Sequence, residues 1–351
     1  MAEENQTTYK RRVRYSGKYP KKFEEKYKEL QPEKYKDTIE HVIKKGNTPA
    51  GMHISIMVNE ILDFLKIQPG ETGFDATLGY GGHTKAMLQC LKGQGHIYAT
   101  DVDPEESART RKRLEEAGFG EDILTIRLQN FCTIDEIAKE AGGFDFILAD
   151  LGVSSMQIDN PKRGFSFKVD GPLDLRLNQE AGISAAERLA AITKDELAGM
   201  LYENSDEPYC EELAKAITDE IRKGNRIDTT TKLRNIIEKT LDFLPEKEKK
   251  DTIKKTCQRT FQALRIDVNR EFEVLYEFME KLPDALKPGG RAAILTFHSG
   301  EDKLVKKALK EGYRAGIYAD YAKDVIRPSA QECAQNGRAR STKMRWAIKA
   351  E

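Results

Sequence analysis

Glycines and acidic residues in the first half of the chain have the types and spacing of a nucleotide-binding site. Three glycines follow the short apolar run 72–77 within four positions, at Gly79, Gly81 and Gly82, and a helical pattern then covers 85–91. A strand, a glycine turn and a helix present bare backbone N–H groups and the positive end of a helix to a ligand. Glycine suits such a turn because a Cβ would block close approach and because tight turns often require positive φ. We therefore predict a ligand-binding turn here, with a purely structural glycine turn as the alternative.

A carboxylate lies about twenty residues beyond this turn, where nucleotide-binding folds place an acid on the ribose hydroxyls. Asp101 ends the apolar run 96–101, and Asp103 follows two positions later. We prefer Asp101 as the ribose ligand because it is nearer the carboxyl end of the strand, where such sheets bind ligands. Asp75 stands four residues before Gly79, and the glycine spacing is not the dinucleotide G-x-G-x-x-G. This pattern is more typical of S-adenosylmethionine (AdoMet) enzymes than of NAD enzymes.

Further candidate residues follow three other apolar runs. Asp150 ends the continuous run 144–150, as expected for a parallel strand buried on both faces. Phe131 lies just past a third strand and could lie against an adenine ring or be a core aromatic. His298 and Ser299 follow a late strand and are candidate pocket residues, although a histidine there is as often a satisfied core residue.

The elements that must position these residues alternate between strands and helices. The patterns predict strands at 72–77, 96–101, 123–128, 144–150 and 291–297, and helices at 53–65, 85–91, 104–117 and 134–140. Such alternation predicts a doubly wound α/β sheet.

The alternation stops after Asp150. The segment 151–176 is irregular yet rich in apolar residues, which favours a functional loop over a disordered one. From 184 to 256 the pattern is entirely helical, with a capping box at Thr193 and Glu196, and we interpret it as an α-helical insertion. The chain then rejoins the core as a helix expected to run from Arg259 through Phe278.

These patterns predict four parts of the chain. They are an N-terminal extension (1–48), the first part of the core (49–158), a helical substrate-recognition insertion (159–257), and the second part of the core with a basic C-terminal tail (258–351).

Composition excludes several classes of protein. Lys and Arg together number 58, as do Asp and Glu, so the net charge is zero and any nucleic-acid binding must use local patches. The five cysteines are scattered without a C-x-x-C pair, which argues against a zinc site or disulfide framework and for a reducing cytosol. The sequence shows neither a signal peptide nor an apolar run of membrane length. We expect a cytoplasmic protein with no membrane association and no metal.

Basic residues gather in two segments. The extension 1–48 interleaves Lys and Arg with Tyr and Phe, which is typical of a solvated, partly helical segment or of an arm that contacts RNA. Near the end of the chain, Arg338, Arg340 and Lys343 could hold RNA phosphates, with a solvated basic face as the alternative.

Several blocks of the sequence, taken in order, resemble the bacterial MraW/RsmH family. The blocks are 75–84, 150–159, 163–167, 170–176, 261–269, 289–299 and 338–341, and the resemblance runs from about His53 to Lys349. It implies a class I, Rossmann-like AdoMet-dependent methyltransferase fold with an inserted helical domain. It also implies methylation of the exocyclic N4 of a cytidine in 16S rRNA of the small ribosomal subunit, with a homodimer as a further expectation.

The resemblance also implies particular residue roles. The positions that match the family's AdoMet contacts are Gly81, Gly82, His83, Asp101, Phe131, Asp150 and Gln157. Asp150 could accept a hydrogen bond from the cytosine amino group, or only orient the methionine end of AdoMet; His298 and Ser299 are the other candidate catalytic residues. Departures such as Ser55, Gly300 and Gly337 concentrate on the expected substrate side. Three alternatives remain open: a relative with a different RNA target, a nicotinamide oxidoreductase, and a non-catalytic ribosome-assembly factor.

Overall fold

The computed structural model describes residues 55–351. The expected N-terminal extension (1–48) lies outside the described residues, as does the start of the helix expected at 53–65.

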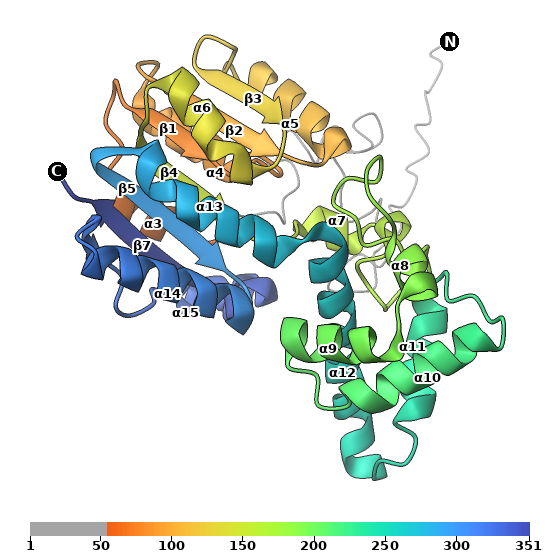
Figure 1. Cartoon of the computed structure of the whole chain (residues 1–351). Helices are drawn as coiled ribbons and strands as arrows, with labels where there is room; N and C mark the ends of the chain where they lie inside the picture. Colours follow the sequence, from red (N-terminus) through yellow and green to blue (C-terminus); the bar gives the residue numbers. More distant parts are fainter. Residues whose placement is uncertain (1–54) are drawn as a thin grey trace, which may run out of the picture. The chain divides into compact units, whose positions relative to one another are not determined.

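A seven-stranded sheet in the order β3-β2-β1-β4-β5-β7-β6 organises this part of the chain (Figure 1). Its strands are β1 (Thr72–Asp75), β2 (His96–Asp101), β3 (Leu124–Leu128), β4 (Phe144–Asp150), β5 (Leu286–Thr296), β6 (Tyr318–Tyr321) and β7 (Lys343–Lys349). The first five strands are parallel, whereas β7 runs antiparallel to both β5 and β6. The strand order reverses between β1 and β4, which is the switch point where doubly wound sheets bind ligands. The α/β fold class is confirmed.

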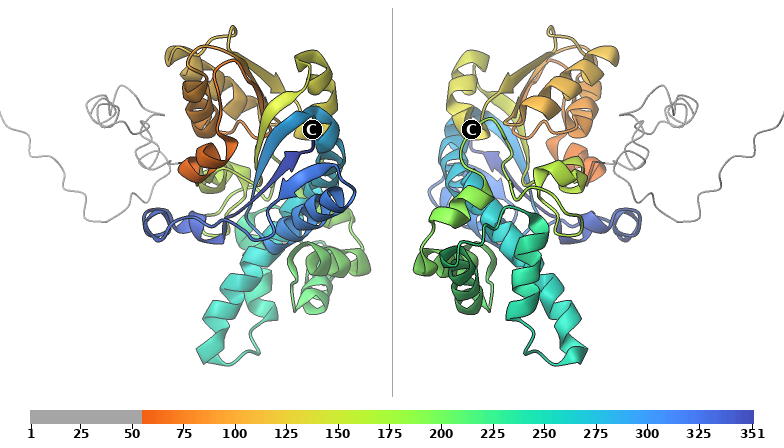
Figure 2. Two further views of the ribbon diagram at one scale, coloured as in Figure 1. Left: turned by 90° about the vertical axis from the view of Figure 1, so that its left-hand side faces the viewer. Right: turned by 90° about the vertical axis from the view of Figure 1, so that its right-hand side faces the viewer.

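Helices cover both faces of the sheet (Figures 1 and 2). On one face pack α3 (Val58–Leu65), α4 (Gly82–Leu91) and α5 (Pro104–Glu116); on the other pack α6 (Ile134–Ala141), α13 (Glu271–Ala285) and α14 (Ser299–Arg314). Successive side chains of a strand point to opposite faces. Phe146 and Leu148 of β4 accordingly join the first core, while Ile147 and Ala149 join the second. The strand ends lie between these two apolar layers, where polar side chains can gather.

The helical segment after β4 has a hydrophobic core of its own. It comprises α8 (Ala185–Ala191), α9 (Lys194–Ser205), α10 (Cys210–Arg222), α11 (Thr230–Thr240) and α12 (Glu246–Asn269). The expected capping box at Thr193 and Glu196 begins α9. Five short elements complete the fold. Between β4 and the helical segment lie α7 (Ser155–Asp159) and η3 (Pro161–Arg163); η2 (Phe131–Thr133) follows β3, and α15 (Ala330–Gln335) and η4 (Gly337–Ser341) precede β7. Figure 1 shows α12 leading from the helical segment back to α13 on the sheet.

The structure departs from the predicted elements at two places on this return path. The helix expected from 259 to 278 is broken at Arg270, whose φ of 52° is left-handed and separates α12 from α13. The boundary expected at 257/258 lies inside the continuous helix α12, so no linker marks it.

Strand β5 also differs from the prediction. Strand β5 begins at Leu286 rather than Arg291, because Pro288 and the glycines that follow it lie in an irregularity where its register with β4 shifts. The expected basic tail is partly strand β7, which pairs with β5 and β6 inside the sheet. Among residues 55–351, no helix is both long enough and apolar enough to cross a membrane.

Candidate active site

At two positions of the glycine turn between β1 and α4, a side chain would force a neighbouring side chain to move. Gly81 has a φ of 79°, and a Cβ there would lie 2.6 Å from the side chain of Thr110. A Cβ on Gly82, the first residue of α4, would lie 2.0 Å from Oγ of Ser55. These glycines therefore let the backbone approach its neighbours closely at a helix N-terminus, as the sequence predicted.

Asp75 fixes the start of this turn from within the core. It is buried, its Oδ2 accepts a hydrogen bond of 2.6 Å from the Thr84 hydroxyl, and its Oδ1 accepts one of 3.0 Å from the Thr77 N–H. Burial raises its pKa, and these hydrogen bonds partly offset that effect. One oxygen joins β1 to α4 and the other holds the first residues of the turn, so Asp75 supports the geometry of the turn.

Asp101 and Asp103 differ in how fully their oxygens are occupied. Asp101 accepts hydrogen bonds from the N–H groups of Gly79 (2.8 Å) and Asp103 (2.9 Å), one on each oxygen, and is partly exposed. Asp103 is 1% exposed; its Oδ1 caps α5 through the N–H groups of Glu105 and Glu106. Since a carboxylate can accept about four hydrogen bonds, Asp101 keeps acceptor capacity toward a ligand.

The second oxygen of Asp103 holds the loop that enters the helical segment. Its Oδ2 accepts from Arg163 Nη1 (2.6 Å) and from Gln157 Nε2 (2.9 Å). The other Nη of Arg163 donates to the carbonyls of Arg176 (3.0 Å) and Leu177 (2.6 Å). Arg163 is therefore a buried clamp between the end of β2 and the loop 160–177. The sequence pointed to the block containing Arg163, but not to this role.

Gln157 also has its amide oxygen occupied. Its Oε1 accepts from the Ser154 N–H at 2.9 Å, in a capping box at the start of α7. The AdoMet contact expected for Gln157 stays a prediction.

Asp150 lies at the switch point, beside His83. Its Oδ2 is 3.4 Å from His83 Nδ1, and His83 Nε2 is 2.9 Å from the carbonyl of Ile56. The Oδ1 of Asp150 is buried and has no hydrogen-bond partner among the described residues. The pKa of Asp150 is raised to about 6, chiefly by burial; the charges of Asp75 and Glu301 add to this rise, and His83 opposes it. A buried oxygen without a donor indicates a position that a ligand's N–H or O–H would satisfy.

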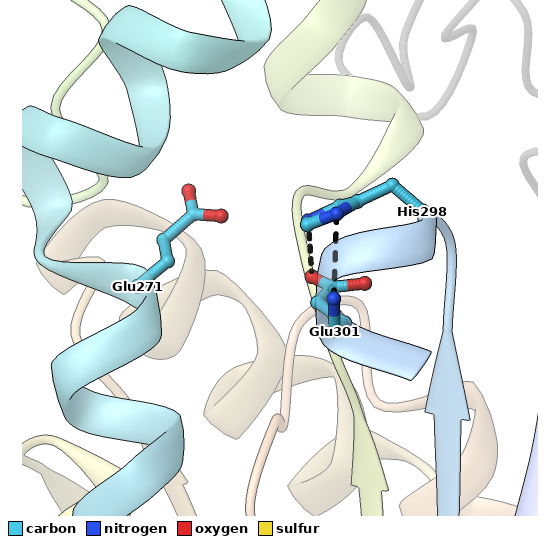
Figure 3. A group of neighbouring side chains, drawn as sticks. All are labelled: Glu271, His298 and Glu301. Atoms are coloured by element: carbon cyan, nitrogen blue, oxygen red, sulfur yellow. Dashed lines mark hydrogen bonds and ion pairs between the residues drawn. The ribbon is translucent and has the colours of Figure 1, made fainter. Parts of the chain in front are cut away.

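A second polar group lies at the end of β5, next to this site (Figure 3). His298 caps α14, and its Nε2 is 3.1 Å from Oε1 of Glu301; Ser299 begins α14 and is exposed. Glu271, on α13, points toward this pair in Figure 3 and is held by Arg265 through two hydrogen bonds of 2.8 Å. Burial alone would raise the pKa of Glu301, but His298 and Arg265 outweigh it and hold that pKa below its usual range.

Glu271, His298 and Glu301 offer donor atoms that lie within 4.8 Å of one another, a spacing that could hold a metal ion. The guanidinium of Arg265 already neutralises Glu271, and the Glu301 Oε2 accepts from the Phe297 N–H at 2.8 Å. These carboxylates thus have cationic or N–H partners from the chain itself. We interpret the cluster as part of the lining of the site, in which Arg265 and a backbone N–H compensate the negative charges of the two carboxylates.

The remaining predicted residues lie in varied settings. Phe131 is half-buried, with its ring edge-on to Phe278 at 5.2 Å between centroids, so one side of it belongs to the core. Arg338 pairs with Asp159 at 2.8 Å and Lys343 with Asp302 at 2.9 Å. Of the three residues expected to bind RNA, only Arg340 is exposed without an ion pair in the described part of the chain.

Comparison with known proteins relates this chain to one group of enzymes. Residues 50–350 match the model of the MraW methylase family. The chain is 86% identical over its whole length to "Ribosomal RNA small subunit methyltransferase H 1" of Agathobacter rectalis, and covers 100% of that protein. It is 70% identical to the protein of that name from Lachnoclostridium phytofermentans (99% of this chain, 95% of the relative). It is 64% identical to "Ribosomal RNA small subunit methyltransferase H 2" of Alkaliphilus metalliredigens (97% of each chain).

The family match spans the sheet, the glycine turn and the helical segment alike. His83 and Asp150, which meet at the switch point, and Asp101 at the end of β2 all lie within it. The chain therefore belongs to the MraW methylase family.

Proposed function

We propose that this chain transfers a methyl group from AdoMet to the exocyclic N4 of a cytidine in 16S rRNA of the small ribosomal subunit. The family and the names of the relatives support methyl transfer to small-subunit rRNA. The single observation that carries the site assignment is the buried, unpaired Oδ1 of Asp150 at the end of β4. A ribosomal substrate would place the protein in the cytoplasm.

The residues at the switch point fit AdoMet as the cofactor. The turn at Gly81 and Gly82 leads into the N-terminus of α4, where backbone N–H groups can receive a ligand. Asp101 keeps acceptor capacity for ribose hydroxyls. Asp150 offers a carboxylate near the methionine end or the reacting methyl group. The residues that would hold the cofactor are Gly81, Gly82, His83, Asp101, Phe131, Asp150 and Gln157.

Asp150 is the group best placed to assist the chemistry. When bound, AdoMet supplies an electrophilic methyl group on a sulfonium. The lone pair of cytosine N4 is delocalised into the ring, so the amine is a poor nucleophile. A hydrogen bond from the amino group to Asp150 Oδ1 would localise that lone pair and stabilise the positive charge that develops on N4. Asp150 can then accept the N4 proton at the same oxygen.

His298 and Ser299 would form the opposite wall of the base pocket. A paired or stacked base must leave its neighbours to reach such a site. Glu301 fixes the His298 ring, through its carboxylate at Nε2 and its backbone N–H at Nδ1, so the ring can position the splayed-out base without reorganising. Arg340 remains available for a phosphate of the same RNA.

Methyl-transfer assays decide between this function and its alternatives. Small subunits from a strain that lacks the gene should accept a methyl group from AdoMet in the presence of the purified protein, and mass mapping should find one N4-methylated cytidine. Binding of subunits without turnover would favour a non-catalytic assembly factor. Methylation elsewhere would favour a relative with a different RNA target, and binding of NADH in place of AdoMet would favour an oxidoreductase.

A further inference from the structure

The helical segment contains a cavity that the proposed chemistry does not use. It has a volume of about 520 Å³ and lies between α11, the first half of α12, and the loop at Phe167 and Lys168. Its volume falls in the range of pockets that enclose small ligands, roughly 300–1,000 Å³. It is a hollow of the helical segment, distinct from the switch point on the sheet.

The rim of the cavity carries an excess of positive charge. Five cations and two acids line it, a net charge of +3 in a chain whose total is zero. Both acids already have partners: Glu238 lies 3.0 Å from Arg234, and Glu246 lies 3.2 Å from Lys249.

The other three cations of the rim are Lys168, Lys250 and Lys254. All three are exposed, and within the described residues none forms an ion pair. The unbalanced charge of the rim therefore lies on these three lysines.

The floor of the same cavity is apolar. Phe167, Ile253 and Cys257 line it, and the Phe167 ring is held edge-on against Phe261 at 5.6 Å between centroids. Burial raises the pKa of the Cys257 thiol, so this side chain is neutral at physiological pH. A cationic rim above an aromatic floor suits a ligand with an anionic part and a flat, apolar part.

We propose that this cavity binds a nucleotide of the substrate RNA that flanks the target cytidine. This inference rests on the proposed function, because it takes that RNA as the ligand. Lys168, Lys250 and Lys254 would contact backbone phosphates, and the base would lie against Phe167 and Ile253. Single-stranded RNA is held in this way, by cations that follow the phosphates and by aromatic rings on which bases stack.

The chain places this subsite within reach of the cofactor site. Lys168 is five residues beyond Arg163, which is ion-paired with Asp103 at the end of β2. An extended chain spans at most about 3.6 Å per residue, so the two Cα atoms are no more than about 18 Å apart. A nucleotide near the target in the same strand can cover that separation.

The test compares two triple variants of the full chain. Lys168, Lys250 and Lys254 are replaced by Ala in one; the control replaces Lys112, Lys139 and Lys310, which are exposed lysines of α5, α6 and α14. We expect the first variant to raise the KM for RNA at least tenfold and to leave kcat and AdoMet affinity unchanged. Losing three phosphate contacts should also lower the slope of log affinity against log salt by about 2. The control should change neither quantity.

A substitution of the floor tests the stacking contact. Phe167→Leu keeps an apolar side chain against Phe261 but removes the ring, so we expect weaker RNA binding, whereas Phe167→Trp should bind as the wild type does. An unchanged KM and salt slope in the lysine variant would overturn the proposal. It would also be overturned if cytidine monophosphate or inorganic phosphate bound as tightly as an RNA oligonucleotide. Filter binding of RNA needs no methyl transfer, so failure of the proposed function shows separately, as wild-type binding without turnover.

Discussion

Burial raises the pKa of both Asp101 and Asp150 to about 6, well above the usual range of a carboxyl group. Both side chains are therefore ionised at pH 7, yet both titrate within the range of ordinary assays. Asp101 ends β2 and Asp150 ends β4, at the same edge of the sheet. Their proposed roles differ: Asp101 binds the ribose of the cofactor, and Asp150 stabilises the charge that develops on N4. Separate measurements of cofactor affinity and of methyl transfer can tell them apart.

Replacing Asp101 by Ala should weaken AdoMet binding by about 1–3 kcal/mol, the range for a buried polar partner left unpaired. The ionised carboxylate is the better acceptor, so wild-type affinity should also fall as the pH drops through about 6 and be constant above it. Calorimetry between pH 5 and 8 measures both effects. Asp63→Ala, at an exposed position of α3, is the control and should bind normally. Equal affinity in the two variants would refute the ribose assignment.

Replacing Asp150 by Asn keeps the side-chain shape and removes the charge. If the carboxylate stabilises charge on N4, single-turnover methyl transfer should fall by roughly two to three powers of ten, while AdoMet still binds. The wild-type rate should rise with pH through about 6, because the ionised form is active, and the variant should lack that rise. Near-normal transfer would make Asp150 structural. Loss of AdoMet binding would make it a cofactor-orienting residue.

At the scale of elements, the loop 160–177 is bound to the sheet by one buried ion pair. Arg163 and Asp103 have side chains that are 5% and 2% exposed. From the other side, Asn269 at the end of α12 donates to the carbonyl of Leu175 at 2.7 Å and accepts from the Leu177 N–H at 2.8 Å. The loop therefore connects the end of β2 to the helix that leaves the helical segment.

Replacing Arg163 by Ala should destabilise the protein by about 3–5 kcal/mol, because it leaves the buried Asp103 carboxylate without its cation. AdoMet affinity should fall too. Arg163 holds Asp103, and the N–H of Asp103 positions the Asp101 carboxylate that is proposed to bind the ribose. Urea unfolding and calorimetry measure the two effects. Lys112→Ala removes one of the exposed i, i+4 ion pairs of α5 and should cost less than about 0.5 kcal/mol. A similar cost in both variants would argue against the clamp.

At the scale of the whole molecule, zero net charge means that RNA must be held by local groups. The basic residues near the end of the chain do not act as one tail, because Asp302 holds Lys343 and Arg345, and Asp159 pairs with Arg338. Those three cations stabilise β7 and its surroundings. Arg340 and the lysines of the helical cavity remain for phosphate contacts.

Replacing Arg340 by Ala should therefore lower RNA affinity and reduce its salt slope by about 0.7, the value for one single-strand phosphate contact. The melting temperature should not change, because Arg340 is exposed and unpaired among the residues described. Lys343→Ala should instead lower the melting temperature, since it removes a partner of Asp302. Filter binding at several salt concentrations and thermal unfolding measure the two outcomes. An unchanged salt slope in Arg340→Ala would make this segment a solvated surface.

The sequence by itself determined the local features of this protein. Short apolar runs, each ending in an acid, located β2 and β4 at their observed bounds, and the glycine spacing located the turn at Gly81 and Gly82, because both signals are local in the chain. The family resemblance rested on short blocks of the same kind. The family match confirms the family that these blocks indicate.

Only the tertiary structure decided which side chains meet. The contact of His83 with Asp150, the clamp of Arg163 on Asp103 and the Arg265–Glu271 pair beside His298 join different elements, so no local pattern encodes them. The break at Arg270 was missed because helical periodicity continues across a single left-handed residue. Partners and burial also fix which cations are free and which carboxylates titrate near pH 6, and both depend on packing between distant segments.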